Sequence, residues 1–332
     1  IHSTSKIFDK VLATRLVDEL PFLVGNHQSA FVKGRSLHDN FMLVQSMECR
    51  LHALRSSTVL LKLDISKAFD SVQWPFLIEV LNQMGFGPRW RSWICGILAT
   101  STTKIMVNGD PRDTIYNCKG PRQGDPISPM LFILTMEPLQ RLFEVAMARG
   151  LLSPLARAGM RKRLSIFADD VVLFIKPNPM DLEVCKSLFE IFGEASGLRI
   201  NMHKSVALPI RCSEEEIAMA CNELQCPLGS FPIKYLGLPL SLRKQTATQL
   251  KILVDHMANQ LPKWRAAMMP KSGRALLISS VLCSIPVHSM LALDVPPKIV
   301  AAMAKICRGF LWCGKDEASG GKCVVAWEAV CT

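Results

Sequence analysis

The stretch Leu164-Ser-Ile-Phe-Ala-Asp-Asp-Val-Val-Leu-Phe-Ile175 is the most informative part of this chain, because two apolar runs are separated only by Asp169 and Asp170. The two runs predict buried strands that are joined by a tight turn. A turn with two aspartates and no glycine is unfavourable, since the like charges repel and the backbone bends less easily. A divalent cation would offset both costs, so the stretch predicts a metal-binding hairpin. Acidic pairs elsewhere in the chain have polar neighbours, which predicts solvated surface.

Two further segments have features of a catalytic site, although each also has a simpler interpretation. Asp64 ends an apolar, strand-like run that starts at Thr58, and in isolation it would be interpreted as the cap of a following helix. The segment Gly120-Pro-Arg-Gln-Gly-Asp-Pro-Ile-Ser-Pro129 predicts a shaped loop that leads into a helix. It is either an ordinary loop or a glycine-rich loop in which Arg122 and Gln123 approach a nucleotide closely.

Helices and antiparallel strands are expected to alternate along the chain. Helical patterns lie at 5–25, 37–54, 74–98 with an interruption at 85–88, 129–147 and 180–196, and residues 243–312 are mainly helical. Strand patterns lie at 58–64, 103–118 around the hairpin signal Asn108-Gly109, 164–175, 198–208 and 234–240. This interleaved order favours an α+β fold over a doubly wound sheet.

The composition is that of a globular, basic protein. Of the 332 residues, 49% are apolar and 20% are charged, and Lys and Arg outnumber Asp and Glu by 39 to 28, which gives a net charge of +11. The basic excess favours nucleic acid over a membrane surface as the partner, although a basic protein without a polyanionic partner has the same composition. The 12 cysteines show neither zinc-ligand spacing nor a disulfide pattern. Reduced thiols are therefore expected, in an intracellular protein of the nucleus or the cytoplasm.

No association with a membrane is expected. The start of the chain is polar and has no signal peptide. The stretch from Ala275 to Leu293 has no charged residue, but it contains four serines, Pro286 and His288. This composition favours a buried helix that breaks near Pro286 over a membrane-spanning helix.

In their order along the chain, these segments closely resemble the motifs of reverse transcriptases: a strand followed by Asp64 and Ala-Phe-Asp70, then Gln123-Gly and Ser128-Pro, then Phe-Ala-Asp-Asp. More narrowly, the chain resembles the LINE-type (non-LTR) retrotransposon enzymes of plants. This resemblance extends over nearly the whole chain and includes Lys6 to Leu16, Gln28 to Ser36, Gly197 to Ser205, Tyr235 to Pro239, Gly273 to Ile278, Phe310 to Gly314 and Trp327 to Cys331.

The resemblance implies an α+β fold of the right-hand polymerase type. Residues 1–57 would form partial fingers, 58–240 an antiparallel-sheet palm with a fingers insertion, and 241–332 a helical thumb with a C-terminal extension. The implied activity is RNA-directed DNA polymerisation, in which a nucleotide is transferred from a dNTP to a primer 3′-hydroxyl. The implied partners are an RNA or DNA template, a DNA primer and a dNTP, with no membrane.

The resemblance also implies which residues catalyse the reaction. Asp64, Asp169 and Asp170, together with the carbonyl of Ile65, match the ligands of two Mg²⁺ ions, for which Mn²⁺ is the alternative. Lys204 matches a lysine that is proposed in the family to protonate the departing pyrophosphate, although a surface lysine is the simpler interpretation.

Further matching positions concern the nucleotide and the two nucleic-acid strands. Phe69 matches the ring that packs under the incoming sugar and excludes a 2′-hydroxyl. The simpler interpretation of Phe69 is core packing, and the two interpretations are compatible. The other implied nucleotide-binding residues are Ile65, Lys67, Ala68, Arg122, Gln123 and Gly124. The residues implied for primer or template are Gly34, Arg35, Tyr235, Leu236, Gly237, Lys263, Arg265, Lys271 and Arg274. The last four would add salt-sensitive affinity, although a solvated basic face has the same sequence pattern.

In this alignment the chain departs from the family at its start. Ile1 falls inside the fingers, so the chain is expected to be a fragment with weak or no polymerase activity. The alternative from another class is a catalytically silent, nucleic-acid-binding remnant of a retroelement. Viral RNA-dependent polymerases and group II intron maturases are related palm enzymes, but Phe-Ala-Asp-Asp and the Ser-Pro helix start speak against the viral option.

Overall fold

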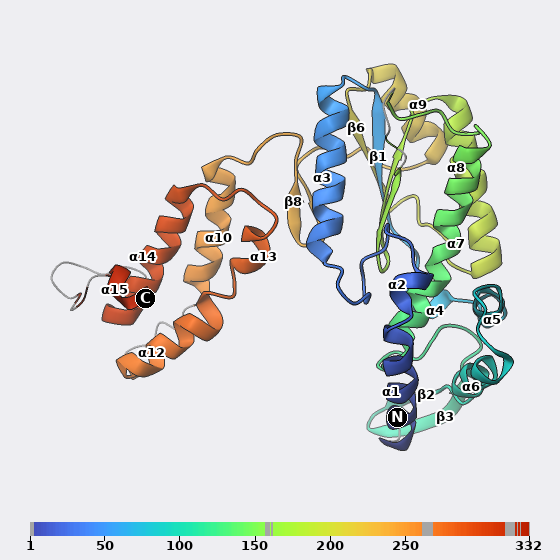
Figure 1. Cartoon of the computed structure of the whole chain (residues 1–332), viewed down its shortest axis with the longest axis horizontal. Coiled ribbons are helices and arrows are strands. Elements are labelled where there is room, and N and C mark those ends of the chain that lie inside the picture. The colour runs from blue at the N-terminus through green and yellow to red at the C-terminus, as the bar shows by residue number, and fades with distance from the viewer. Residues whose placement is uncertain are drawn as a thin grey trace. The chain divides into compact units, whose positions relative to one another are not determined.

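The computed structural model describes residues 3–156, 160, 162–260, 268–315, 323, 325 and 327–331. The chain divides into two compact units, Ile1–Leu242 and Arg243–Thr332, and each is described by itself (Figure 1). All the strands of the described residues belong to the first unit, and the second unit contributes helices.

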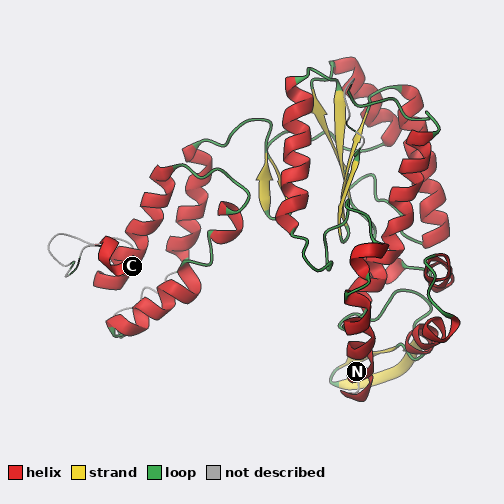
Figure 2. Cartoon of the chain, in the orientation of Figure 1, coloured by secondary structure: helices red, strands yellow, loops and turns green. Residues whose placement is uncertain are grey.

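A four-stranded antiparallel sheet forms the centre of the first unit, and its strands are yellow in Figure 2. The order is β4-β5-β1-β6, with β4 Leu164–Phe167, β5 Asp170–Ile175, β1 Thr58–Leu63 and β6 Val206–Ile210. The nearly continuous apolar sequences of β1 and β5 are expected for central strands that are buried on both faces. The predicted α+β fold with an antiparallel sheet is confirmed.

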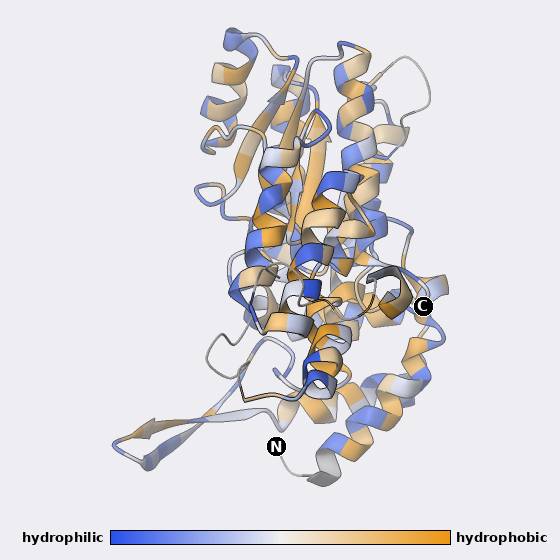
Figure 3. Cartoon of the chain, turned by 90° about the vertical axis from the view of Figure 1, so that its left-hand side faces the viewer, coloured by the Kyte–Doolittle hydropathy of each residue, from blue (hydrophilic) through white to orange (hydrophobic). Residues whose placement is uncertain are grey.

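Helices cover both faces of this sheet: α3 Leu37–Ala53, α7 Ser128–Ala148 and α8 Pro179–Ser196. On one face, Leu61 and Leu63 of β1 share a core with Phe132 of α7. On the other face, the ring of Phe41 in α3 lies 6.4 Å from the ring of Tyr235. Figure 3 shows the central strands mostly in the hydrophobic colours. The sheet is therefore a rigid layer between two apolar cores, and its strand ends are fixed in space.

The remaining elements of the first unit surround this core. They are α1 Ser3–Val17, α2 Leu20–Leu23, α4 Ala68–Ser71, α5 Trp74–Gln83, α6 Pro88–Ala99, β2 Thr102–Val107, β3 Asp110–Tyr116, α9 Glu214–Leu224, β7 Ile233–Tyr235 and β8 Leu238–Leu240. Strands β2 and β3 form one separate hairpin, and β7 and β8 form another.

Three sequence predictions differ from the structure. The single helix expected at 5–25 is two helices, α1 and α2, because the chain turns where Glu19 N–H donates to the carbonyl of Leu16. The strand expected at 198–208 begins only at Val206, since a hydrogen-bonded turn precedes it. Helix α9 was not expected, although Ser213 and Glu216 form the capping box that signals a helix start.

The second unit is built from helices: α10 Ala247–Asn259, α12 Lys271–Leu277, the π-helical turn η1 Ile278–Leu282, α13 Val287–Met290, α14 Pro297–Cys313 and α15 Trp327–Cys331. Pro286 directly precedes α13, so the uncharged stretch at 275–293 is divided into short segments, as its proline predicted. The predicted burial is wrong, because most residues of this stretch are exposed. Among the helices of the described residues, none has both the length and the hydrophobicity that a membrane span needs.

Candidate active site

The acidic hairpin is formed by β4 and β5, in which Phe167 pairs with Asp170. The loop therefore consists of Ala168 and Asp169 alone, and the prediction that both aspartates lie in the turn is wrong for Asp170. Ala168 has a φ of 54°. This left-handed conformation costs a residue other than glycine about 1–2 kcal/mol, so the strain of the tight turn lies at Ala168.

Asp64 lies opposite Asp170 across the β1–β5 pair. The register pairs Leu63 with Val171, so the adjoining residues of the two segments, Asp64 and Asp170, face each other. Residues that lie directly opposite in an antiparallel pair have their side chains on the same face of the sheet. The three aspartates that the sequence singled out therefore gather at one end of the central sheet.

The charges at this end of the sheet influence one another. Burial raises the pKa of Asp170, the positive charge of Lys62 lowers it, and the negative charges of Asp169 and Asp64 raise it. Lys62 also donates a hydrogen bond to the carbonyl of Lys234 at 2.9 Å, which connects the acidic end of the sheet to the β7–β8 hairpin. A bound cation stabilises a partly buried group of like charges of this kind.

The donor atoms at this end of the sheet suit a hard divalent cation. Carboxylate and carbonyl oxygens are the ligands that Mg²⁺ prefers, and Ile65 lies buried directly after Asp64. In the part of the chain that the structure describes, no three His, Cys, Asp or Glu side chains are grouped closely enough to hold a metal ion together. The register places the backbones of Asp64 and Asp170 opposite each other, so these two side chains start from the same face of the sheet.

A turn at residues 201–205 fixes the backbone of Asp64. Asn201 N–H donates to the carbonyl of Asp64 at 2.7 Å, and Ser205 Oγ accepts a hydrogen bond from Asp64 N–H at 3.0 Å. Lys204 belongs to the same turn, where its N–H donates to the carbonyl of Asn201, and its side chain is exposed. The structure thus places Lys204 in the turn that holds Asp64, and sequence reasoning missed the contacts of Asn201 and Ser205.

Two buried amides hold the acidic turn. Gln28 is 1% exposed, and its Oε1 accepts hydrogen bonds from the N–H of Ala30 at 2.9 Å and of Ala168 at 3.2 Å. Asn40 is 2% exposed, and its Nδ2 donates to the carbonyl of Ile166 at 2.6 Å. Sequence reasoning missed both residues. The available signal for Asn40 was a polar residue at a core-facing position of a mainly apolar helix face.

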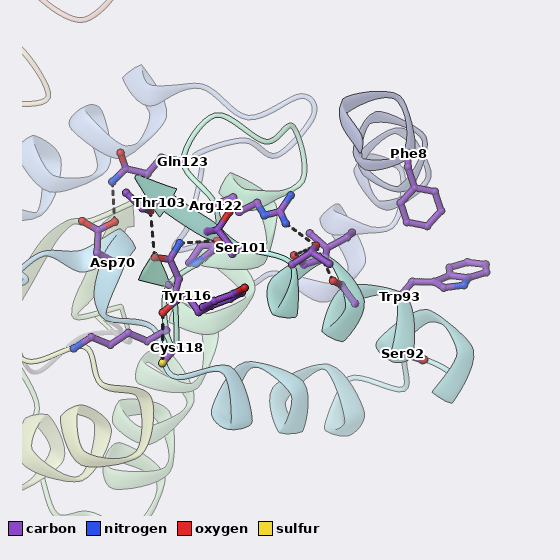
Figure 4. A pocket seen from close by; sticks show the side chains of 18 residues that line it. Phe8, Asp70, Ser92, Trp93, Ser101, Thr103, Tyr116, Cys118, Arg122 and Gln123 are labelled. Carbon is purple, nitrogen blue, oxygen red and sulfur yellow. Dashed lines mark hydrogen bonds between the residues drawn. The ribbon is translucent and has the colours of Figure 1, made fainter. Parts of the chain in front are cut away.

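The glycine-rich loop lies against the segment that follows Asp64. A Cβ at Gly120 would stand 2.9 Å from the Cα of Asp70, so glycine is needed for this close approach. Gln123 Nε2 donates to Asp70 Oδ1 at 2.7 Å (Figure 4). Arg122 donates to Thr100 Oγ1 at 2.6 Å. The structure therefore brings the predicted nucleotide-binding loop together with Asp70, in the segment that follows Asp64.

The other predicted nucleotide-binding residues lie on the same two segments. The ring of Phe69 stacks on that of Phe132, with centroids 5.4 Å apart and an interplanar angle of 26°, so core packing is observed. Lys67 is exposed with a φ of 45°, and Ala68 is buried at the start of α4. Gly124 is exposed and has a φ of 91°. Their contacts with a nucleotide stay predictions.

Residues 1–240 match the family model of reverse transcriptases, described as RNA-dependent DNA polymerases. The chain belongs to the reverse transcriptase family. It is 31% identical over 322 residues to the "Transposon TX1 uncharacterized 149 kDa protein" of Xenopus laevis, covering 95% of this chain and 24% of that protein. It is 26% identical over 237 residues to the Pol polyprotein of the type-2 retrotransposable element R2DM of Drosophila melanogaster, and this match covers 69% of this chain and 22% of that protein. This reverse transcriptase chain thus spans about a quarter of the length of these relatives.

A telomerase structure from Candida tropicalis, in complex with the TWJ fragment of telomeric RNA, resembles this reverse transcriptase with a TM-score of 0.50 and 10% sequence identity. The match covers 89% of this chain and 50% of that chain, and at this identity it supports the fold alone. The predicted polymerase fold and the predicted retrotransposon family are confirmed, and the plant-like subgroup stays a prediction.

Arg35 of this reverse transcriptase has a structural role, and its contact with the template stays a prediction. Its guanidinium donates to four backbone carbonyls: Gly25 at 2.6 Å, Gln28 at 2.7 Å, Val24 at 2.9 Å and Pro21 at 3.3 Å. These bonds close the loop that carries the Gln28 side chain to the acidic turn. The neighbouring Gly34 is exposed with a φ of 79°, and its contact with the template stays a prediction.

Arg35→Gln is expected to lower the free energy of unfolding by about 3 kcal/mol, because part-buried carbonyls lose a charged donor. Urea unfolding followed by circular dichroism measures this loss. Lys33→Gln is the matched control, since Lys33 forms an exposed ion pair with Asp18 at 3.3 Å, and we expect a change within about 0.5 kcal/mol. An Arg35→Gln chain of normal stability with weakened template binding would contradict the structural role and support a contact with the template.

In the β7–β8 hairpin the turn is accessible at Gly237, whereas the side chain of Tyr235 is buried. Tyr235 is 0% exposed and packs on Phe41, so a primer contact by its side chain is wrong. Leu236 and Gly237 form the turn, with φ values of 49° and 82°, and Gly237 is exposed. A contact between this turn and the primer stays a prediction.

The basic residues of the second unit pack on its own helices. Lys271 lies 5.2 Å above the ring of Trp312, and Arg274 donates to the carbonyl of Leu311 at 3.4 Å. Both contacts attach α12 to α14, and the Lys271 side chain remains exposed. The predicted Lys263 and Arg265 lie outside the described residues.

Proposed function

We propose that this reverse transcriptase chain catalyses RNA-directed DNA synthesis, the transfer of a nucleotide from a dNTP to a primer 3′-hydroxyl. The observation that most supports this proposal is the position of Asp64 opposite Asp170, with Asp169 in the adjoining turn. In such a reaction the attacking and leaving oxygens carry negative charge, and neighbouring carboxylates can hold the cations that stabilise this charge. A buried sheet whose ends are fixed by packing keeps such a cluster in register.

We assign two divalent cations to this cluster, Mg²⁺ with Mn²⁺ as the alternative. The ligands would be Asp64, Asp169, Asp170 and the carbonyl of Ile65. When bound, the ions stabilise the negative charge of the attacking and leaving oxygens. The contribution of the chain is to orient the ligands, since hydrogen bonds fix the backbone of Asp64 and hold Ala168, which precedes Asp169.

The nucleotide would lie between the cluster and the glycine-rich loop. Phe69, which is supported by Phe132, would pack under the sugar and exclude a 2′-hydroxyl by steric contact. Lys204 would donate a proton to the departing pyrophosphate from the turn beside Asp64. The further contacts that we propose for the nucleotide are those of Lys67, Ala68, Arg122, Gln123 and Gly124.

The domains and partners follow from the same proposal. Residues 1–57 would act as fingers, 58–240 as palm with a fingers insertion, and 241–332 as thumb with a C-terminal extension. An RNA template and a DNA primer would contact Gly34, Leu236, Gly237, Lys263, Arg265, Lys271 and Arg274. The described cysteines are free, which supports a reducing compartment, the nucleus or the cytoplasm.

Primer extension on poly(rA) with an oligo(dT) primer tests the proposed activity. We expect weak incorporation of dTTP that depends on Mg²⁺ and stops when EDTA removes the metal. Incorporation of rUTP should be at least about tenfold lower, because Phe69 excludes the 2′-hydroxyl. Binding of the template–primer without incorporation, at saturating Mg²⁺ and Mn²⁺, would contradict the proposal and favour a silent nucleic-acid-binding remnant.

A further inference from the structure

A large cavity adjoins the glycine-rich loop and extends beyond the residues assigned to the reaction. Its volume is about 1400 Å³, and α6, the root of the β2–β3 hairpin and the segment that leads into the loop line it. Figure 4 shows Asp70 and Gln123 on one side of the view, Trp93 and Phe8 on the other, and Tyr116 between them. The cavity therefore begins where we place the incoming nucleotide and leads away from it.

The lining combines aromatic, basic and small polar side chains. Tyr116 is 72% exposed, and Lys119 is exposed as well. Trp93 and Arg122 also line the cavity, and the guanidinium of Arg89, which is outside the lining, lies 5.1 Å above the ring of Trp93. Over residues 86–124 the sequence contains six Lys and Arg and only two Asp. A ligand that carries negative charges together with flat rings suits these walls.

The β2–β3 hairpin is fixed at its root and exposed along its length. Every residue of both strands is exposed, including the apolar side chains on either face. At the root, Asn117 N–H donates to the carbonyl of Ser101 at 3.0 Å, and Asn117 Nδ2 donates to Ser101 Oγ at 2.7 Å. These bonds position Tyr116 without burying it. A two-stranded hairpin that is exposed on both faces is marginally stable alone, so a ligand that covers Tyr116 would stabilise it.

We propose that this cavity binds an unpaired nucleic-acid strand, with Tyr116 as the ring on which a base stacks and Lys119 as a contact to a phosphate. Exposed aromatic rings beside a basic groove are the means by which proteins bind single strands without pairing to their bases. A duplex suits these walls poorly, because its bases cover one another's faces. The assignment of the strand as the template ahead of the incoming nucleotide rests on the proposed function, since Gln123 lines the cavity and contacts Asp70.

Binding of fluorescein-labelled oligo(rU) of about 12 nucleotides, measured by anisotropy in EDTA, tests the site without catalysis. Tyr116→Leu is expected to weaken binding about tenfold, because a stacked base loses its ring. Lys119→Gln is expected to reduce the slope of log affinity against log salt concentration by about 0.7, the value for one phosphate contact on a single strand. The affinity for a blunt RNA duplex should not change in either variant.

Phe22→Leu is the matched control, because Phe22 is 86% exposed on α2 and does not line the cavity. We expect the oligo(rU) affinity of the control to equal that of the unsubstituted chain, and thermal unfolding to be the same in all variants. An unchanged oligo(rU) affinity in Tyr116→Leu overturns the proposal, and so does an equal loss of affinity for the blunt duplex. Because this assay contains no metal, a failure of primer extension counts against the proposed function and not against this site.

Discussion

Replacing Asp170 by Asn is expected to reduce DNA synthesis at least about a thousandfold while the chain remains folded. The substitution removes a charged ligand of the proposed cations, and the loss of about 4 kcal/mol of transition-state stabilisation corresponds to this factor. The fold should be as stable as before or slightly more stable. Burial and the negative charges of Asp169 and Asp64 raise the pKa of Asp170 in spite of the nearby Lys62. The ionised carboxylate therefore destabilises the fold at neutral pH, and an amide has no charge to bury.

Initial rates of primer extension and urea unfolding curves measure the two effects of Asp170→Asn. Glu183→Gln is the matched control, since Glu183 is an exposed carboxylate of α8, and both its rate and its stability should be unchanged. Template–primer binding in EDTA should be retained in both variants, because the substitution removes no contact to nucleic acid. A variant that keeps more than about a tenth of the activity, or one that unfolds, contradicts the metal-ligand role.

The sheet could be predicted from the sequence because its central strands are buried on both faces. Such strands read as continuous apolar runs, and the runs at 58–63 and 170–175 are the two paired central strands β1 and β5. Glycine and proline residues indicated where loops lie. The pair Asn108-Gly109 correctly predicted the β2–β3 hairpin. The convergence of Asp64 with Asp170 follows from the register of these strands, which depends on packing and which only the resemblance anticipated.

The residues that orient the site could not be predicted, because their partners are backbone groups far away in the sequence. Gln28 accepts a hydrogen bond from Ala168, 140 positions further along the chain. Arg35 looked like a free basic residue, yet its donors bind carbonyls of its own loop. Tyr235 lies in a short hairpin where the local pattern does not distinguish a buried ring from an exposed one, and the packing of α3 decides its burial. Long-range polar contacts of this kind leave no periodic signal in the sequence.

Gln28→Leu is expected to lower primer extension about a hundredfold and the free energy of unfolding by about 2–4 kcal/mol. Leucine has a similar size but no acceptor, so the N–H groups of Ala30 and Ala168 lose the partner that holds them, at about 1–3 kcal/mol for each group. Ala168 already has a positive φ, and without this bond the turn can relax and displace Asp169. A displacement of about 1 Å at a reacting centre is enough for a hundredfold loss of rate.

The dependence of extension on Mg²⁺ separates a positioning role of Gln28 from a purely structural one. If Gln28 orients the acidic turn, Gln28→Leu should raise the half-saturating Mg²⁺ concentration about tenfold, a typical loss when a group that orients a metal ligand is removed. Asn178→Ala is the matched control, because Asn178 caps α8 by accepting a hydrogen bond from Asp181 N–H at 2.8 Å, beyond the opposite end of β5. The control should lose about 1 kcal/mol of stability without a change in Mg²⁺ dependence. An equal Mg²⁺ dependence in Gln28→Leu and the unsubstituted chain would mean that the acidic turn keeps its geometry without this buried amide.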